Sequence, residues 1–472
     1  MSTNFPLELT GDQMRRMVGS AMDRIVDHIE SLPQQPAADI DGSLELAKQL
    51  IETEPPESGT PFEGLLESLF QDWIPKSFNT AGPGYLAYIP GGGIFHAAVA
   101  DLIADAVNRY VGVCAAAPAL VQLESNVIRW FCRFVGYPAG AGGVLTTGGS
   151  LANFTAVVTA RKEKLADSFQ NGILYASDQV HHSVQKAANL AGFPHSNVRE
   201  IPVDDLLRMR LDALEESIVR DRADGLEPFM IIGSAGTTNT GAVDDLCGIA
   251  AIARRHSMWF HVDAAYGGFF ILTERGRAVM RGIEEADSIT LDPHKALFIP
   301  YGTGSLLVRD AAALQRAHSL HAAYLPAMQE EAGLVDFCEI SPELSRGYRG
   351  LRVWLPLKMA GVDVFRRQLD EKLDLTLWAT EQLRAIRGVE IVAEPQLSIV
   401  AFRFVREGLS DDELNPINEQ ILARINERKR VMVTPTVIGG RYVIRICVVS
   451  FRTHADRMEM AIEDIRAAIA EV

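Results

Sequence analysis

One lysine of this sequence stands where an amine can act as a nucleophile. Lys295 closes the segment 292–295 (DPHK), which follows an apolar run and precedes the apolar residues 296–298 (ALF). Apolar neighbours partly remove water from an ammonium group, which favours the neutral amine and suits the lysine to Schiff-base chemistry. A surface lysine beside a proline turn is the alternative interpretation.

A glycine turn upstream offers an anchor for a phosphate group. The segment 146–153 (TTGGSLAN) lies between an expected strand and an expected helix. Gly149 lets the backbone approach an anion closely, Ser150 adds a hydroxyl donor, and the helix start supplies free N–H groups and a favourable dipole. Taken alone, the segment is more typical of an ordinary glycine turn with a serine cap.

Two further strand ends carry an acid and a histidine. Asp263, in 261–268 (HVDAAYGG), can hold a cationic group, and the small Ala265 leaves room for a flat ring. His181, in 177–183 (SDQVHHS), can stack on an aromatic ligand or move protons. An isolated aspartate is more often a loop cap, and a lone histidine is more often a satisfied residue near the core.

Together the four segments predict a site for pyridoxal 5′-phosphate (PLP). This cofactor requires a phosphate anchor, a carboxylate that keeps its pyridine nitrogen protonated, and a lysine that forms an imine with its aldehyde. A metal hydrolase or a cofactor-free nucleotide-binding protein would leave Lys295 without a role, and the histidines lack HExxH or comparable ligand spacing. We therefore expect a PLP enzyme without a metal centre.

Short β-rich runs alternate with helical stretches between residues 86 and 375, which we expect to form one large domain. The runs are 144–147, 173–177, 229–234, 258–263, 288–292 and 304–308, and helices are expected over 150–166 and 182–191. This alternation favours an α/β fold with a mostly parallel sheet flanked by helices. In such folds ligands bind at the carboxyl ends of strands, where the four segments lie.

Two smaller regions flank this domain. Residues 1–85 contain three short amphipathic helix candidates joined by proline-rich turns, so we expect a helical arm that packs on a partner subunit. Residues 376–472 are expected to form a small α+β domain. Its expected elements are a helix over 376–387, strands near 389–393, 397–405, 430–434 and 442–450, and a helix over 454–470.

Composition and charge narrow the class of protein. The 472 residues are 47% hydrophobic and 22% charged, and the formal net charge is −16. An acidic chain argues against nucleic acid or anionic lipid as the main partner. We see no secretory signal, no run of eighteen apolar residues and no CxxC spacing among the five cysteines. We expect a cytoplasmic enzyme with reduced thiols and no membrane partner.

The motifs HVDAAYGG and DPHK, with TTGGSLAN and SDQVHHS upstream, resemble those of the group II PLP-dependent amino-acid decarboxylases. That family includes aromatic-L-amino-acid, histidine and glutamate decarboxylases, and the resemblance covers nearly the whole chain. It implies fold type I, the aspartate-aminotransferase fold, and a homodimer with swapped N-terminal arms and active sites at the subunit interface. It also implies decarboxylation of an L-amino acid, with aromatic substrates expected, through an external aldimine and a quinonoid.

The resemblance assigns roles to individual residues. Lys295 is implied to form the imine with PLP, and Asp263 to contact the pyridine nitrogen. Gly149 and Ser150 are implied to hold the phosphate, and Ala265 and His181 to lie on the two faces of the ring. The remaining implied contacts are those of Thr238 and His294 with the cofactor and of Tyr88 with the substrate.

One departure from the family pattern concerns the reaction. The family has a loop tyrosine thought to protonate the carbanion; counted back from Trp354, that position falls on Phe337, which has no proton to give. In plant relatives a phenylalanine there accompanies aldehyde synthases, which consume O2 and release an aldehyde, ammonia and hydrogen peroxide. The alternative is a different loop alignment with Tyr324 or His181 as the proton donor.

Three other residues bear on substrate and class. Gly350 stands where plant relatives use glycine for indolic and serine for phenolic substrates, which indicates a roomy pocket. Ala296 follows the lysine where many aromatic decarboxylases have tryptophan, and Asp292 replaces a common asparagine. An aminotransferase or a cysteine desulfurase of the same fold stays an alternative to a decarboxylase.

Overall fold

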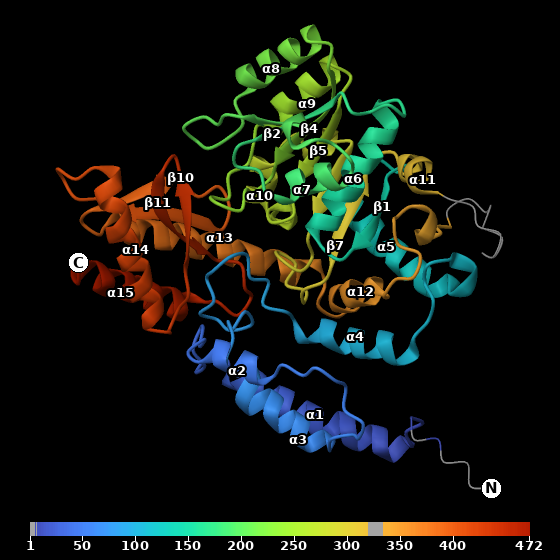
Figure 1. The fold of residues 1–472 in the computed structure, drawn as a ribbon, viewed down its shortest axis with the longest axis vertical. Coiled ribbons are helices and arrows are strands. Elements are labelled where there is room, and N and C mark those ends of the chain that lie inside the picture. Colours follow the sequence, from blue (N-terminus) through green and yellow to red (C-terminus); the bar gives the residue numbers. More distant parts are fainter. Residues whose placement is uncertain (1–4, 6, 320–333) are drawn as a thin grey trace.

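A computed structural model of the chain describes residues 5, 7–319 and 334–472. A seven-stranded sheet forms the centre of the large domain, in the order β1-β7-β6-β5-β4-β2-β3 (Figure 1). Its strands are β1 (Gly142–Thr146), β2 (Gly172–Ser177), β3 (Val198–Ile201), β4 (Glu227–Ser234), β5 (Trp259–Asp263), β6 (Ser288–Leu291) and β7 (Gly304–Val308). Strand β7 is antiparallel to β1 and β6, and the remaining neighbouring pairs are parallel. The predicted mostly parallel α/β sheet is confirmed.

Both faces of this sheet are buried. Neighbouring residues of a strand point to opposite faces, and each face packs in its own hydrophobic core. Leu145 and Ile231 pack in one core with helices α5 (Pro118–Phe134), α8 (Leu211–Ala223) and α9 (Leu246–Arg255). Val144 and Met230 pack in the other core with α6 (Gly149–Lys164) and α7 (Ser183–Leu190). Burial on both sides explains why the strands are nearly continuous apolar runs in the sequence.

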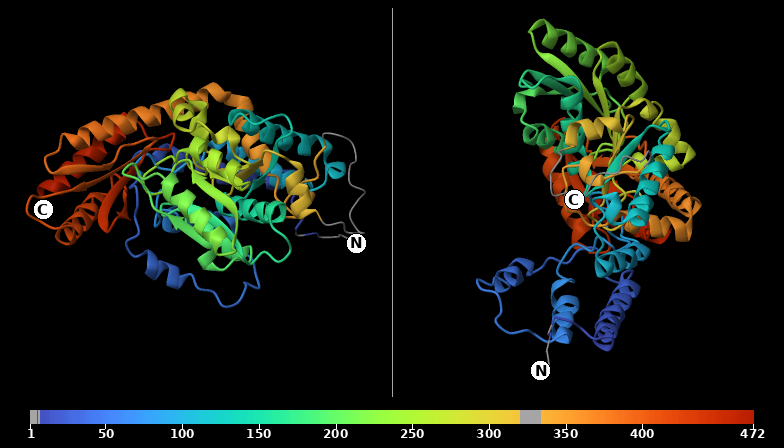
Figure 2. Two further views of the ribbon diagram at one scale, coloured as in Figure 1. Left: turned by 90° about the horizontal axis from the view of Figure 1, so that it is seen from above. Right: turned by 90° about the vertical axis from the view of Figure 1, so that its right-hand side faces the viewer.

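The chain ends form two further units. The N-terminal arm contains α1 (Gly11–Ser31), α2 (Ser43–Gln49), α3 (Phe62–Glu67) and a π-helical turn over Ser68–Trp73. Its helices project from the rest of the chain (Figure 2), while Pro33, Asp39 and Asp41 bond Arg457 and Lys429 of the C-terminal unit. The C-terminal unit has an antiparallel sheet in the order β10-β11-β9-β8. Its elements are β8 (Val389–Ala393), β9 (Ile399–Phe404), α14 (Asp411–Glu427), β10 (Thr434–Ile438), β11 (Arg441–Cys447) and α15 (Ala455–Ala470).

The other α-helices described lie in the large domain or lead out of it. They are α4 (Phe95–Val107), α10 (Glu274–Val279), α11 (Ala312–His318), α12 (Arg349–Ala360) and α13 (Val362–Arg384). Within the described residues, no helix combines the length and apolarity needed to cross a bilayer.

The structure differs from the sequence expectations at several elements, and the strand expected near 430–434 is observed as β10 over Thr434–Ile438. The helix expected to begin at residue 376 is the second half of α13, which runs unbroken from the large domain to the small one (Figure 1). Helix α14 was not predicted, because Pro416 inside it is a helix-breaking residue in a sequence pattern. The edge strand β3 was also missed, since its four residues are too few for a period to be recognised.

Candidate active site

Eight of the eleven predicted site residues line one cavity of about 280 Å³ at the carboxyl ends of the strands. They are Gly149, Ser150, His181, Thr238, Asp263, Ala265, His294 and Lys295. The loops and helix starts that follow the strands bring them together from positions up to 146 residues apart in the sequence. In α/β folds the loops that follow parallel strands lie at one edge of the sheet, so residues distant in the sequence meet there.

The turn between β1 and α6 forms a cradle at one side of the cavity. The Thr146 hydroxyl donates to the Gly148 carbonyl at 3.0 Å and accepts from the Gly148 N–H at 3.3 Å, which fixes the turn. A Cβ atom on Gly149 would lie 3.0 Å from Asp292 Oδ2 and 3.2 Å from Ala265 Cβ. A side chain here would crowd Asp292 and Ala265, whereas glycine leaves the space open. The start of α6 directs backbone N–H groups towards it, as a phosphate requires.

Asp263 is held rigidly at the end of β5. Its side chain is 8% exposed, its Oδ1 accepts from the Ala265 N–H at 3.1 Å, and its Oδ2 accepts from the Asn153 amide at 2.9 Å. Two hydrogen bonds to fixed donors give the carboxylate one orientation at the cavity wall. A cationic ring nitrogen is a chemically matched partner for it.

Lys295 lies in the turn after β6, where its ammonium group is paired. Its Nζ is 3.2 Å from Asp292 Oδ2, and the two side chains are 21% and 2% exposed. The other carboxylate oxygen, Asp292 Oδ1, is buried and has no hydrogen-bond partner within the described residues. The turn also packs closely on the N-terminal segment, since a Cβ atom on Gly91 would be 2.3 Å from the His294 carbonyl.

The two histidines of the cavity are held as neutral rings. Burial lowers the pKa of His181 and also that of His294. His294 Nδ1 lies 2.6 Å from the Thr303 carbonyl, which only accepts, so this nitrogen carries the proton. The phosphate cradle, the fixed carboxylate, the lysine and the neutral histidine together fit PLP.

Sequence reasoning missed several lining residues of the same cavity. Asn153 and Ser183 are buried in it, although the motifs TTGGSLAN and SDQVHHS contain them both. Each is a polar residue on the buried face of a helix near its start, and that pattern could have indicated both of them. Tyr88 is 54% exposed and does not line the cavity, and its substrate contact stays a prediction.

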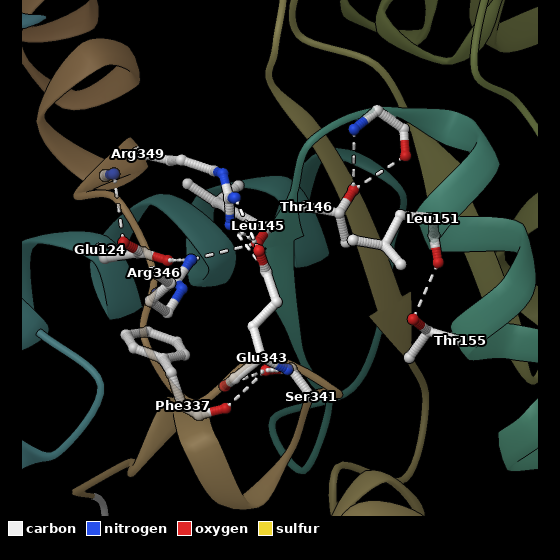
Figure 3. Close-up of polar contacts among 12 residues, drawn as sticks. Glu124, Leu145, Thr146, Leu151, Thr155, Phe337, Ser341, Glu343, Arg346 and Arg349 are labelled. Atoms are coloured by element: carbon white, nitrogen blue, oxygen red, sulfur yellow. Dashed lines mark hydrogen bonds and ion pairs between the residues drawn. The ribbon is translucent and has the colours of Figure 1, made fainter.

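The structure corrects the placement predicted for Phe337. Its ring is 1% exposed, packs in the core beside α6, and lies 4.7 Å from the Arg346 guanidinium (Figure 3). Arg346 is itself fully buried in an ion pair with Glu124 at 2.6 Å. A ring enclosed in this way does not line the cavity. Of the two alternative donors, His181 lines the cavity, whereas Tyr324 lies outside the described residues.

Gly350 is also placed differently from its prediction. It lies at the start of α12, does not line the cavity, and donates its N–H to Glu124 Oε2 at 3.1 Å. A Cβ atom there would be 2.5 Å from the Glu124 Cβ. This glycine therefore allows α12 to pack closely on α5, and its effect on substrate size stays a prediction.

Replacement of Phe337 by tyrosine tests this correction. A hydroxyl added to the enclosed ring is expected to lower the free energy of unfolding by about 1–3 kcal/mol, since a buried polar group without a partner is costly. The reaction product is expected to be unchanged. Chemical denaturation measures the free energy of unfolding, and product analysis identifies the product. The matched comparison is Tyr324→Phe, which removes a tyrosine hydroxyl instead of adding one. A change of product in Phe337→Tyr would show that this side chain reaches the reacting atoms.

Comparisons with known proteins agree with this geometry. The pyridoxal-dependent decarboxylase conserved domain matches residues 45–405. The chain is 36% identical to an aromatic-L-amino-acid decarboxylase of Bacillus atrophaeus, over 100% of this chain and 98% of the relative. It is 28% identical to the Bos taurus aromatic-L-amino-acid decarboxylase, over 98% and 97%. The crystal structure of Oryza sativa TDC with PLP and tryptamine superposes with a TM-score of 0.93, at 28% identity and 99% coverage of both chains.

The chain belongs to the pyridoxal-dependent decarboxylase family. It is an enzyme of the aspartate-aminotransferase fold that uses PLP to decarboxylate an amino acid. The predicted family, fold class, cofactor and type of reaction are thereby confirmed.

Proposed function

We propose that this enzyme decarboxylates an aromatic L-amino acid to the corresponding amine and CO2. The observation that carries the proposal is the convergence of the cradle, Asp263 and Lys295 on one cavity. The substrate class is supported by the two aromatic-L-amino-acid decarboxylases that match the chain over nearly its whole length.

Each residue around the cavity has a proposed part in holding PLP. The backbone of Gly149 and the hydroxyl of Ser150 bind the phosphate at the start of α6. Asp263 pairs with the pyridine nitrogen, and Lys295 supplies the amine that links to the aldehyde. Ala265 and His181 lie against the two faces of the ring. Thr238 and His294 complete the set of proposed cofactor contacts.

When bound, PLP supplies an aldehyde that links to amines and a ring that accepts electrons from the bond being broken. The chain's own residues create the conditions for this chemistry. Asp263 keeps a fixed negative charge beside the ring nitrogen, which stabilises positive charge there without reorganisation during the reaction. Lys295, which pairs with Asp292, would hold the cofactor through its amine when PLP is bound. His181 is placed to move a proton at its ring nitrogen.

Product analysis in air and under nitrogen tests the proposal. Purified enzyme with added PLP is given L-tryptophan, L-phenylalanine, L-tyrosine and L-dopa, while CO2, amine, aldehyde, peroxide and oxygen uptake are measured together. We expect amine and CO2 with no oxygen uptake. Aldehyde and peroxide that disappear under nitrogen would show the aldehyde-synthase reaction instead. An absence of product from every aromatic substrate would overturn the substrate class while leaving the type of reaction in place.

We also propose that the enzyme is a homodimer in which a second copy covers the N-terminal arm. Helix α1 has no buried residue, and its apolar side chains Met14, Met17, Val18 and Val26 are 41–49% exposed. Helix α4 also exposes apolar side chains, and a cavity of about 600 Å³ lies between the arm helices. Exposed apolar faces of this extent are typical of protein interfaces.

Replacement of Val18 by aspartate is expected to weaken the dimer by about 10-fold or more, because a charge would be buried in an apolar interface. Sedimentation velocity over a dilution series measures the dissociation constant. Val219→Asp on α8 is the matched control, since Val219 is 56% exposed and α8 lies far from the arm (Figure 1). A monomeric wild-type enzyme at micromolar concentration would refute the proposal.

A cytoplasmic location is the third part of the proposal. The five cysteines form no disulfide, and Cys132 and Cys447 are buried as reduced thiols. Reduced thiols of this kind are typical of proteins kept in a reducing compartment.

A further inference from the structure

A chain of buried, hydrogen-bonded side chains lies behind the cavity, and Asn153 is its centre. Asn153, in α6, is 1% exposed, and its amide nitrogen lies 2.9 Å from Asp263 Oδ2 and 3.0 Å from Ser183 Oγ. Its amide oxygen lies 2.7 Å from Thr290 Oγ1 and 3.2 Å from His261 Nε2. All four hydrogen-bonding positions of the amide are therefore used.

The chemistry of the partners fixes the direction of these hydrogen bonds. A carboxylate accepts, so the amide NH2 of Asn153 faces Asp263 and also donates to Ser183. The Ser183 backbone N–H donates to His181 Nδ1 at 3.3 Å, and the Ser183 hydroxyl lies 2.8 Å from the same nitrogen. Nδ1 of His181 is therefore an acceptor, and the neutral ring carries its proton on Nε2.

His261 extends the chain on the buried side. The Asn153 carbonyl oxygen accepts, so His261 donates from Nε2, and its Nδ1 accepts from the Ser288 hydroxyl at 2.8 Å. The Trp259 indole N–H donates to that hydroxyl at 2.8 Å. Burial lowers the pKa of His261 to about 4, so the ring holds a single proton, as this arrangement requires. The donors from Trp259 to His181 thus point in one direction, and hydrogen bonds in series strengthen one another.

We propose that Asn153 is a positioning residue for the decarboxylation: one amide fixes the carboxylate of Asp263 and, through Ser183, the proton-bearing nitrogen of His181. The proposal rests on the proposed roles of Asp263 and His181 at the cofactor. Because the same amide holds both groups, neither can reorient without breaking a buried hydrogen bond. The other titratable groups that act on His181 are His182, Lys295 and Asp292.

The variant Asn153→Asp tests the proposal in the holoenzyme, because it keeps the shape of the side chain and removes the donor. A second carboxylate would then face Asp263. We expect the dissociation constant of PLP to rise and kcat to fall by about 10–100-fold each, the value of a hydrogen bond to a charged group. We expect KM to stay within about threefold, and the pH midpoint of the bound cofactor's absorbance to shift by about one unit.

Asn418→Asp is the matched control for a merely structural effect. Asn418 is fully buried in α14 and bonds the backbone of Phe404 and Leu414, far from the cavity in the fold. This control is expected to lower the melting temperature and to leave the absorbance midpoint and kcat unchanged. Equal changes in both variants, or an unchanged PLP affinity and absorbance midpoint in Asn153→Asp, would overturn the proposal.

A measurement on the wild-type enzyme covers the case in which Asn153→Asp does not fold. Nitrogen chemical shifts of ¹⁵N-histidine-labelled enzyme identify which ring nitrogen of His181 carries the proton, with His181→Gln used to assign the signal. A neutral ring with its proton on Nε2 supports the proposal, and a proton on Nδ1 overturns it. Both readouts are independent of the product formed, so a failure of the aromatic substrate assignment would not be mistaken for a failure of this inference.

Discussion

Replacement of Lys295 by alanine is expected to abolish the covalent attachment of PLP and to lower kcat by about 10³-fold or more, because no other positioned amine can take its place. Lys295 is the lysine that lines the cavity. Lys372, whose side chain is fully buried, is held by Glu371 at 2.9 Å and by the Thr453 carbonyl at 2.6 Å. It is therefore not free to act as a nucleophile.

Borohydride reduction followed by peptide mapping measures this attachment directly. In the wild-type enzyme the reduced cofactor is expected on the peptide that contains Lys295, and in Lys295→Ala on no peptide. Lys358→Ala is the control, since Lys358 is an exposed residue of α12 outside the cavity. Label on a different lysine of the wild-type enzyme would contradict the assignment, whatever the activity of the variants.

Replacement of Asp263 by asparagine is expected to lower kcat by about 10²–10³-fold, because a fixed charge aimed at the reacting system is among the largest contributions to catalysis. The amide has a similar shape, but it cannot keep a pyridine nitrogen protonated. The same change also places an NH2 or a neutral oxygen against the Asn153 amide and the Ala265 N–H. Steady-state kinetics and the absorbance spectrum of the bound cofactor measure the two effects.

A buried aspartate elsewhere separates this catalytic effect from a loss of stability. Asp221 is 3% exposed, bonds the Tyr175 hydroxyl at 2.7 Å and forms an ion pair with Arg199 at 2.8 Å. Asp221→Asn is expected to destabilise the fold by about 1–3 kcal/mol while leaving the kcat of the folded enzyme within about twofold. A similar loss of kcat in both variants would argue against a special role for Asp263.

The two corrected residues show where reasoning from the sequence fails. Phe337 and Gly350 were assigned by counting along the chain from neighbouring motifs, and counting carries no information about which way a side chain points. In the structure the ring of Phe337 packs against Arg346 (Figure 3). Gly350 lies against Glu124. Gly350 and Glu124 are 226 residues apart in the sequence, and Phe337 packs on an arginine held by a buried ion pair with Glu124. No local sequence pattern indicates either contact.

The sequence by itself determined the α/β class, the position of six of the seven central strands and six of the residues that meet at the cavity, and the family resemblance added Thr238 and His294. It could do so because apolar runs buried on both faces are local signals, and because parallel strands bring their carboxyl ends to one edge. The tertiary structure alone decided the unbroken α13, the enclosed Phe337 and the hydrogen bonds that converge on Asn153. These features depend on the partners each side chain meets, and those partners come from distant parts of the chain.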